Sequence, residues 1–236
     1  MKTAIITGAS SGIGRSITLQ LAKLNYSLVI TGRNKEKLLL LKKTIEKQGS
    51  DCLPVVADLH AGDATSQIIE KTMEQFGQID VLVNNAGIAH SAPVLETDVE
   101  VWNQLFNVNA RAPFLLCKQA IPHIKKSKNP VIINIGSVVG FKGYSGQAAY
   151  AASKHALTGF TKVLAKEVQQ DGIQVHLISP GGVNTEMATA MRPDINTENL
   201  ILPEEIAELV EFLVTRKGKG TIDHFYVRRK NGLTFD

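Results

Sequence analysis

The sequence has little of what marks metal-binding, disulfide-rich and membrane proteins. Its two cysteines, Cys52 and Cys117, lie far apart and indicate neither a disulfide framework nor a CxxC site. Its six histidines never fall within four residues of one another, so no metal site is predicted. No run of about 18 apolar residues occurs, and Met1 to Gly8 carries neither a basic region nor a cleavage site. We therefore expect a reduced, cytoplasmic protein that does not span a membrane.

A strong excess of one charge is also missing. The 26 basic and 22 acidic residues give a formal net charge of only +4, and aromatic residues make up 6% of the chain. A nucleic-acid partner is therefore not expected, and a small anionic ligand would suit the slight basic excess equally well. With 44% apolar residues among 236, the chain can build one sizeable core, so we expect a single domain over residues 1–236.

What the sequence does contain is a regular alternation of short apolar runs and longer amphipathic segments. The apolar runs predict seven strands: Thr3–Thr7, Ser27–Thr31, Cys52–Val56, Val81–Asn84, Val131–Ser137, Gln174–Ser179 and Asp223–Arg228. The segments between them predict helices: Ile13–Leu24, Lys35–Gln48, Ser66–Phe76, Val99–Lys125, Ala148–Gln169 and Pro203–Val214. This alternation is typical of an α/β fold with a doubly wound (Rossmann) parallel sheet covered by helices on both faces.

One long segment, from Pro180 to Leu202, has no regular pattern. Irregular segments of this length in a compact domain are usually functional, and we expect a substrate lid over about residues 182–202. In open parallel sheets, ligands bind at the carboxyl ends of the strands, where the glycine-rich and polar motifs of this sequence also occur.

The first of these motifs follows the first strand and precedes a helix. It reads Thr7-Gly8-Ala9-Ser10-Ser11-Gly12-Ile13-Gly14. Backbone N–H groups and the positive end of the helix dipole can face a pyrophosphate there, and glycine lets the backbone approach it closely. A tight turn without a ligand is the alternative, but the position at the first strand-to-helix junction favours a dinucleotide.

Arg33 and Asp58 follow the second and third strands. An NAD enzyme is expected to carry an acid at the position of Arg33 for the ribose 2′-hydroxyl, whereas a guanidinium can bind a 2′-phosphate, so NADP(H) is favoured over NAD(H). Asp58 can accept a hydrogen bond from the adenine amino group, with a turn or helix cap as the alternative.

Taken together, the motifs resemble those of the short-chain dehydrogenase/reductase superfamily, in particular its 3-oxoacyl-carrier-protein reductase-like members. The resemblance rests on the Thr7–Gly14 turn, Asn84-Asn85-Ala86-Gly87, Asn109, Ser137, Tyr150-x-x-x-Lys154 and Pro180-Gly181, in this order and spacing, and covers essentially the whole chain. It implies an oxidoreductase that transfers a hydride between NADP(H) and a carbonyl or secondary alcohol.

The resemblance also implies roles for single residues. Tyr150 is the expected acid and base, Ser137 holds the substrate oxygen, Lys154 binds the nicotinamide ribose, and Asn109 holds a water in a proton relay. The implied cofactor-binding residues are Gly8, Ser10, Ser11, Gly12, Ile13, Gly14, Arg33, Asp58, Leu59, Asn85, Ala86, Gly87, Tyr150, Lys154, Pro180, Gly181, Val183 and Thr185. Apolar side chains are expected to line the substrate pocket: Val138, Val139, Phe141, Tyr144, Met187 and Met191.

Two further expectations come from the residues themselves. Tyr150 and Lys154 share one helix face, and the positive charges of Lys154 and of a bound oxidised nicotinamide are expected to lower the pKa of the phenol toward neutrality. Pro113 stands four residues after Asn109 and has no N–H, which would leave the Asn109 carbonyl free for a water, with a simple helix kink as the alternative.

Several alternatives stay open at this point. The chain could bind NADP(H) as a sensor or scaffold without catalysis. A hydrolase is not favoured, because Gly143-Tyr-Ser145-Gly-Gln147 lacks the last glycine of a nucleophile elbow. Small and apolar residues on one helix (Ala149, Ala152, Ala156, Phe160 and Val163) predict a homodimer or homotetramer, with burial inside the monomer as the alternative. Basic residues near the carboxyl terminus, including Arg228, Arg229 and Lys230, are expected on solvated faces, with an acidic carrier protein as the other candidate.

Overall fold

A seven-stranded parallel sheet organises the protein. The computed structural model describes residues 1–191 and 195–232, and the strand order in the sheet is β3-β2-β1-β4-β5-β6-β7. Every neighbouring pair is parallel; Ile5, for example, pairs with Val29 on one side and Leu82 on the other. The strands are β1 (Thr3–Thr7), β2 (Ser27–Gly32), β3 (Cys52–Val56), β4 (Val81–Asn84), β5 (Val131–Ile135), β6 (Gln174–Pro180) and β7 (His224–Val227).

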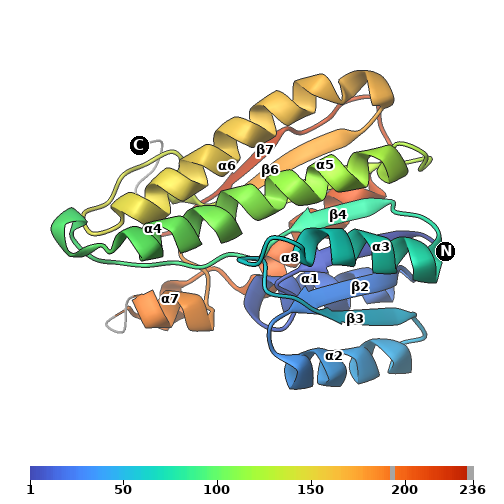
Figure 1. The fold of residues 1–236 in the computed structure, drawn as a ribbon, viewed down its shortest axis with the longest axis horizontal. Helices are drawn as coiled ribbons and strands as arrows, with labels where there is room; N and C mark the ends of the chain where they lie inside the picture. Colours follow the sequence, from blue (N-terminus) through green and yellow to red (C-terminus); the bar gives the residue numbers. More distant parts are fainter. Residues whose placement is uncertain (192–194, 233–236) are drawn as a thin grey trace.

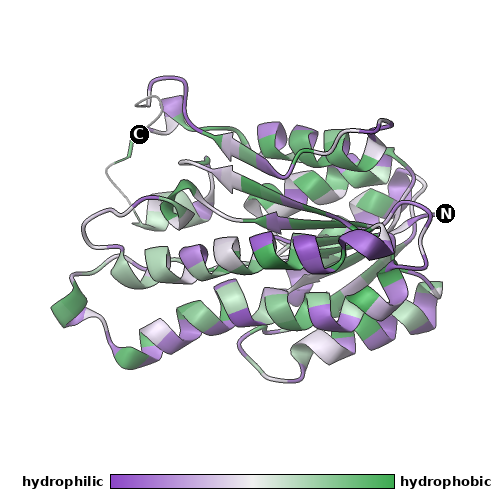
Figure 2. Ribbon diagram, turned by 90° about the horizontal axis from the view of Figure 1, so that it is seen from above, coloured by the Kyte–Doolittle hydropathy of each residue, from purple (hydrophilic) through white to green (hydrophobic). Residues whose placement is uncertain are grey.

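The strands run parallel because helical segments connect successive strands, and these helices then cover both faces of the sheet. All five residues of β1 and all five of β5 are buried, which a strand can only achieve when helices cover both faces of the sheet. Val and Ile dominate these strands, and their branched side chains pack well on a pleated surface. Figure 2 shows these hydrophobic strands lying between two layers of helices.

Each face of the sheet has its own apolar core. On one face, α1 (Gly12–Lys23), α2 (Lys35–Lys47) and α8 (Pro203–Thr215) pack against Ile6, Ile30 and Ile133. On the other face, α3 (Ala64–Phe76), α5 (Ala112–Ile124) and α6 (Ala148–Glu167) pack against Ile5, Val29 and Ile132. Alternate strand residues therefore point to opposite cores, as the two-residue period of a strand requires.

The segments at the carboxyl ends of the strands are mostly short. They include α7 (Glu186–Met191) and 3₁₀ turns at Val94–Glu96, Val138–Gly140 and Thr197–Asn199, whereas the 3₁₀ turn at Gln169–Asp171 precedes β6. Figure 1 places α7 at the end of the molecule opposite the N-terminus, beyond the ends of the strands. The predicted lid over about 182–202 thus contains one helix and one 3₁₀ turn, and its residues 192–194 lie outside the described residues.

Most predicted elements differ from the structure by one or two residues at their ends, and two of the differences lie beside the site. The expected helix Val99–Lys125 consists of α4 (Val99–Phe106), a π-helical turn at Asn107–Arg111 and then α5. Pro113 cannot donate the next helical hydrogen bond, and the wider π turn accommodates the interruption while Pro113 takes the first turn of α5, where a proline is tolerated. Strand β5 ends at Ile135 instead of Ser137, because Ser137 begins the 3₁₀ turn at 138–140.

Within residues 1–191 and 195–232, no helix has the length and apolar character needed to cross a membrane. The same residues contain no group of three or more His, Cys, Asp or Glu side chains that could hold a metal ion. Cys52 and Cys117 are free thiols, buried in the two different cores.

Candidate active site

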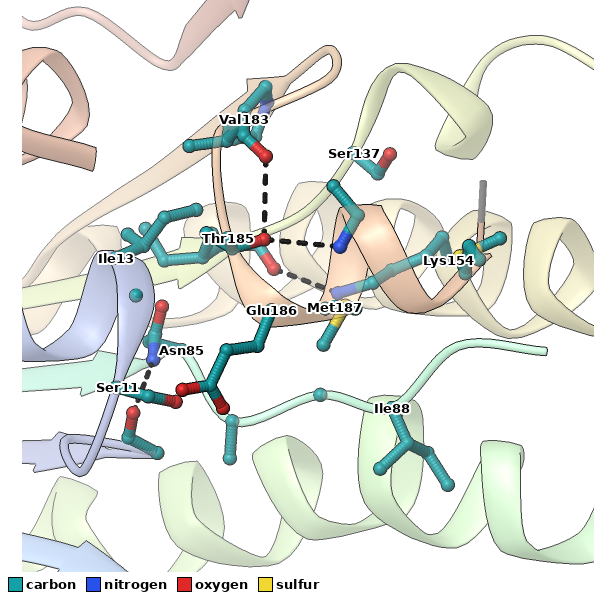
Figure 3. Close-up of a pocket in the computed structure, with 18 of the residues that line it drawn as sticks. Ser11, Ile13, Asn85, Ile88, Ser137, Lys154, Val183, Thr185, Glu186 and Met187 are labelled. Carbon is teal, nitrogen blue, oxygen red and sulfur yellow. Dashed lines mark hydrogen bonds between the residues drawn. The ribbon is translucent and has the colours of Figure 1, made fainter. Parts of the chain in front are cut away.

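A cavity of about 460 Å³ lies at the carboxyl ends of the strands. It is lined by segments that follow β1 to β7, which are the places where the sequence carries its motifs. Of the predicted site residues, all but Gly14 and Asn109 line it. Figure 3 shows how side chains from the glycine turn, the β4 end, α6 and the start of α7 converge on this space.

The glycine turn is shaped by close backbone packing. Gly8 and Gly12 have φ values of +64° and +50°, a conformation that L side chains rarely adopt. Gly14 has a packing role instead of lining the cavity, because a Cβ there would lie 2.3 Å from the Gly8 carbonyl oxygen. A Cβ on Gly12 would come within 2.9 Å of Thr185, so the turn and the start of the lid are in close contact. The exposed backbone of this turn fits a pyrophosphate, whereas a turn with side chains would fill the space.

The end of β4 is held against this turn by its own hydrogen bonds. The Thr7 hydroxyl accepts hydrogen bonds from the backbone N–H groups of Asn85 (3.0 Å) and Ala86 (2.9 Å). The Asn85 amide donates to the carbonyls of Thr7 (2.8 Å) and Gly8 (3.2 Å). The Asn85 side chain therefore fixes the glycine turn, and the Asn85–Gly87 segment presents its backbone to the cavity.

The two residues predicted for the adenosine end line the same cavity. Arg33 follows β2, and no hydrogen bond or ion pair of its guanidinium occurs among the residues that the structure describes. One oxygen of Asp58 accepts a hydrogen bond from the His60 N–H (3.0 Å), which is the turn role foreseen as an alternative. The other carboxylate oxygen of Asp58 would accept the predicted hydrogen bond from the adenine amino group, and this role stays a prediction.

Asn109 and Lys154 meet on either side of Gly87. A Cβ on Gly87 would lie 3.3 Å from Asn109 Oδ1 and 3.5 Å from Lys154 Nζ. The buried Asn109 amide accepts from the Ile88 N–H (2.9 Å) and donates to the Ile88 carbonyl (2.9 Å) and to Ser153 Oγ (3.0 Å). The Asn109 side chain therefore joins the segment after β4 to α6, and only its backbone carbonyl remains a candidate for a water.

Lys154 is a buried amine held close to the sheet. Its side chain is 5% exposed, and Nζ donates to the Ile135 carbonyl at 3.1 Å. Burial lowers the pKa of Lys154 from 10.5 to about 8. An ammonium with a pKa near 8 keeps its proton at neutral pH yet releases it easily, which suits a proton relay.

The pKa of Tyr150 differs from the sequence expectation. Burial raises the pKa of the phenol above its usual value of 10, and a side-chain hydrogen bond with Ser137 opposes this rise only in part. Desolvation, which disfavours the phenolate, has the largest effect on the pKa of Tyr150, and Lys154 does not lower this pKa in the protein alone. Tyr150 is therefore a neutral proton donor in the protein alone, directly beside Ser137.

The structure also brings unpredicted residues to the cavity. Thr31, Gly32, Ala57, Ile88, Val108, Ile135, Gly136, Gln147, Gly182, Glu186, Ala188, Ile195 and Arg229 line it as well. Most follow strands already expected to contribute, so their proximity to the motifs could have indicated them. Phe141, expected in the substrate wall, lies outside the lining and stacks on His224 with a centroid distance of 4.7 Å. Arg229, expected on a solvated face, is instead half-buried on the cavity wall, because β7 lies beside β6 at the sheet edge.

A doubly wound parallel sheet with a glycine turn after β1 and a cavity along its carboxyl edge defines the class of α/β nucleotide-binding proteins. A family model described as short chain dehydrogenase matches residues 2–196. The chain belongs to this family, and it is a nicotinamide-dependent oxidoreductase that acts on carbonyl or alcohol groups.

Three similar proteins illustrate the relationship. A 3-oxoacyl-[acyl-carrier-protein] reductase of Staphylococcus epidermidis is 34% identical over 227 residues, which cover 92% of this chain and 93% of the relative. An acetoacetyl-CoA reductase of an Acinetobacter species is 37% identical over 229 residues, covering 92% of each chain. The crystal structure of a metagenomic short-chain oxidoreductase in complex with NADP has a TM-score of 0.85 and 32% identity, with 97% of each chain covered.

Proposed function

We propose that the protein reduces small carbonyl compounds with NADPH and oxidises the corresponding secondary alcohols in reverse. The observation that carries the proposal is the neutral phenol of Tyr150, hydrogen-bonded to Ser137 on the wall of the cavity. A protonated phenol is ready to act as an acid, which is what carbonyl reduction requires.

The roles of the four residues follow from their positions. NADPH, when bound, supplies the hydride. Tyr150 donates its proton to the carbonyl oxygen, and the Ser137 hydroxyl hydrogen-bonds the same oxygen. Lys154, whose pKa is about 8, returns a proton toward Tyr150 and holds the ribose hydroxyls. Asn109 holds the relay water through its backbone carbonyl and fixes the strand end through its side chain.

NADP(H) is the proposed cofactor because Arg33 stands where an acid would select NAD(H). Its guanidinium has no protein partner in the described part of the chain, so it is available to a 2′-phosphate. Arg33→Asp is expected to weaken NADPH binding by about tenfold or more, since it replaces an ion pair by like-charge repulsion. NADH binding should change little.

The segment 182–202 is the proposed substrate lid, and the protein is proposed to form a homodimer or homotetramer. Thr185 and Glu186 begin the lid directly over the glycine turn, which supports its closing on a bound cofactor. Exposed apolar side chains on α5 and α6, Phe114 (46%) and Val163 (54%), support a subunit contact on that face. Ala149 of the predicted contact stripe is buried inside the monomer, as the alternative foresaw.

The test is the loss of nicotinamide absorbance with NADPH and NADH across ketones, diketones and ketoacyl thioesters, for the wild type and Tyr150→Phe. Turnover with NADPH that disappears in Tyr150→Phe, while the variant still binds NADPH, is the expected outcome. Tight NADPH binding without turnover in the wild type would overturn the proposal in favour of the sensor or scaffold.

A further inference from the structure

A cation without a protein partner lines the cavity at the β7 end. Arg229 comes two residues after β7 and is half-buried. Across residues 1–191 and 195–232, its guanidinium makes no hydrogen bond, ion pair or aromatic contact. Because partial burial of an unpaired charge costs free energy, a free guanidinium facing a cavity calls for an anion there.

The backbone that carries Arg229 is firmly held. Nη1 of the neighbouring Arg228 donates to the carbonyls of Arg229 (3.1 Å), Lys230 (3.4 Å) and Gly232 (3.1 Å). The Gly232 N–H also donates to the Arg229 carbonyl at 3.0 Å. Upstream, the Gly181 N–H donates to the Val227 carbonyl at 2.7 Å, which ties this segment to the end of β6. Arg229 is thus presented from an ordered turn, as a binding group requires.

The side chain of Arg229 lies beside Gly182, at the start of the proposed lid. A Cβ on Gly182 would lie 3.8 Å from Arg229 Cδ and 3.0 Å from Leu200. The aliphatic part of the Arg229 side chain therefore packs next to Gly182, and the absence of a side chain at Gly182 lets it approach the backbone of the lid. This places its charge on the cavity wall beside the lid and away from bulk solvent on that side.

The position of Arg229 in the sheet separates it from Arg33, the other unpaired guanidinium of the cavity in the described part of the chain. Neighbouring strands lie about 4.8 Å apart, so β2, which precedes Arg33, is roughly 24 Å from β7. Strand β1, which precedes the glycine turn, is roughly 19 Å from β7 by the same spacing. The backbone that carries Arg229 therefore lies across the sheet from Arg33, which argues against a 2′-phosphate shared by the two guanidinium groups. Strand β5, which precedes Ser137, is only about 10 Å away.

The other charged residues of the cavity have different partners or places. Lys154 donates to the Ile135 carbonyl, and Glu186 pairs with Lys37 at 3.2 Å. Arg33 and Asp58 lie toward the β2 and β3 edge of the sheet. Arg229 therefore supplies the unpaired positive charge near the proposed reaction centre.

We propose that Arg229 binds an anionic group on the carbonyl substrate, and so selects substrates whose ketone lies a few bonds from a carboxylate or phosphate. The inference rests on the proposed function and narrows its substrate class. A free keto acid carries such a group itself, and a coenzyme A thioester carries phosphates on its carrier. The planar guanidinium suits both, because it offers two parallel donors to two oxygens.

The experiment compares matched anionic and neutral substrates. The ratio of kcat/KM is measured for 4-oxopentanoate against its methyl ester, and for acetoacetyl-CoA against the neutral N-acetylcysteamine thioester. The wild type is expected to favour an anionic member by about tenfold or more, Arg229→Gln should lose this preference through KM, and Arg229→Lys should retain part of it. Lys230→Gln removes a neighbouring exposed charge and should leave the preference intact.

The two substrate pairs separate the source of the anion. A preference confined to the first pair assigns the site to a substrate carboxylate, and one confined to the second assigns it to a carrier phosphate. Equal losses for charged and neutral substrates, or a raised KM for NADPH in Arg229→Gln, would overturn the inference. Direct titration of 4-oxopentanoate and of coenzyme A into the NADP-loaded protein gives a readout independent of turnover, with about tenfold weaker binding of the selected anion expected in Arg229→Gln. Absence of turnover with normal anion binding would contradict the proposed function alone.

Discussion

Lys37 Nζ on the first turn of α2 lies 3.2 Å from Glu186 Oε1 on the first turn of α7. The pair connects the helix that follows Arg33 to the start of the proposed lid, across the mouth of the cavity. Figure 3 shows the Glu186 side chain directed toward the Ser11 side of this space. The Glu186 carboxylate thus lies near the proposed phosphate-binding positions, and its ion pair with Lys37 partly neutralises the positive charge of that lysine.

Glu186→Gln is therefore expected to tighten NADPH binding. The substitution removes a negative charge that repels the phosphates and frees Lys37 to attract them, and we expect Kd to fall on the order of twofold to fivefold at low salt. Both side chains are largely exposed, so the free energy of unfolding should change by less than about 1 kcal/mol. Fluorescence titration with NADPH and thermal denaturation measure the two quantities.

Glu46→Gln is the matched control for this variant. Glu46 forms an exposed ion pair with Lys42 at 3.4 Å on the same helix, away from the cavity lining. Its removal should leave the NADPH affinity unchanged. Weaker binding in Glu186→Gln would show that the salt bridge positions the lid and does not compete with the cofactor.

Much of the fold could be predicted because it depends on local patterns. The strands are short apolar runs, and their ends coincide with the motifs, so the cavity lining was largely foreseen from Gly8 to Thr185. The π turn at 107–111 was missed, since a single π turn adds only one residue to an otherwise α-helical pattern. Only the proline at position 113 hinted at the interruption.

The parts of the site that the sequence did not predict depend on contacts between segments far apart in the chain. Arg229 reaches the cavity because β7 pairs with β6, and the Lys37–Glu186 pair joins residues far apart in the chain. Neither has a local sequence signal, since an arginine after a strand and a lysine on a helix are ordinary surface residues. The strong desolvation of the Tyr150 phenol in the protein alone was also not predicted, because it depends on the packing around the phenol.

Lys154→Met tests how much the burial of the Lys154 amine lowers the free energy of unfolding. The pKa of Lys154 is about 8 in the folded protein and 10.5 as its ordinary value, so between these pH values the unfolded chain binds more protons. The contribution of Lys154 to the free energy of unfolding therefore rises from pH 8 to 10.5 and is lost as the pH falls through 8. Near pH 7 the free energy of unfolding of the variant should exceed that of the wild type by up to about 3 kcal/mol, before the lost hydrogen bond to the Ile135 carbonyl is counted. This difference should shrink as the pH rises toward 10.5.

Urea denaturation of both proteins at pH 7, 8, 9 and 10 measures this difference. Tyr26, Cys52 and Cys117, whose pKa values burial raises to about 12, also titrate at alkaline pH. They contribute equally to both proteins and cancel in the comparison. A difference that stays constant over this range would mean that the pKa of Lys154 is the same in the folded and unfolded states.

Pro113→Ala tests the proposed water site at Asn109. An alanine supplies an N–H that can bond the Asn109 carbonyl, which would displace the relay water. We expect kcat to fall several-fold, on the order of 1 kcal/mol in activation free energy, while the KM for NADPH stays unchanged. Steady-state kinetics across pH 6–9 measure the change. Pro122→Ala, at an exposed proline within the same helix, should have wild-type kinetics, and identical behaviour of the two variants would contradict the relay role.

The face formed by α5 and α6 is expected to carry the subunit contact. Phe114 and Phe160 pack edge to face with a centroid distance of 5.7 Å, and Val163 on the next turn of α6 is 54% exposed. Figure 1 shows these two helices running side by side along one face.

Val163→Asp would place a charge in a desolvated contact, a cost of several kcal/mol per dimer, and should shift the protein to a smaller species in light scattering after gel filtration. Leu40→Asp, at an exposed leucine of α2 on the other face of the sheet, should leave the mass unchanged. A mass that responds to Leu40→Asp and not to Val163→Asp would place the contact on the opposite side of the molecule.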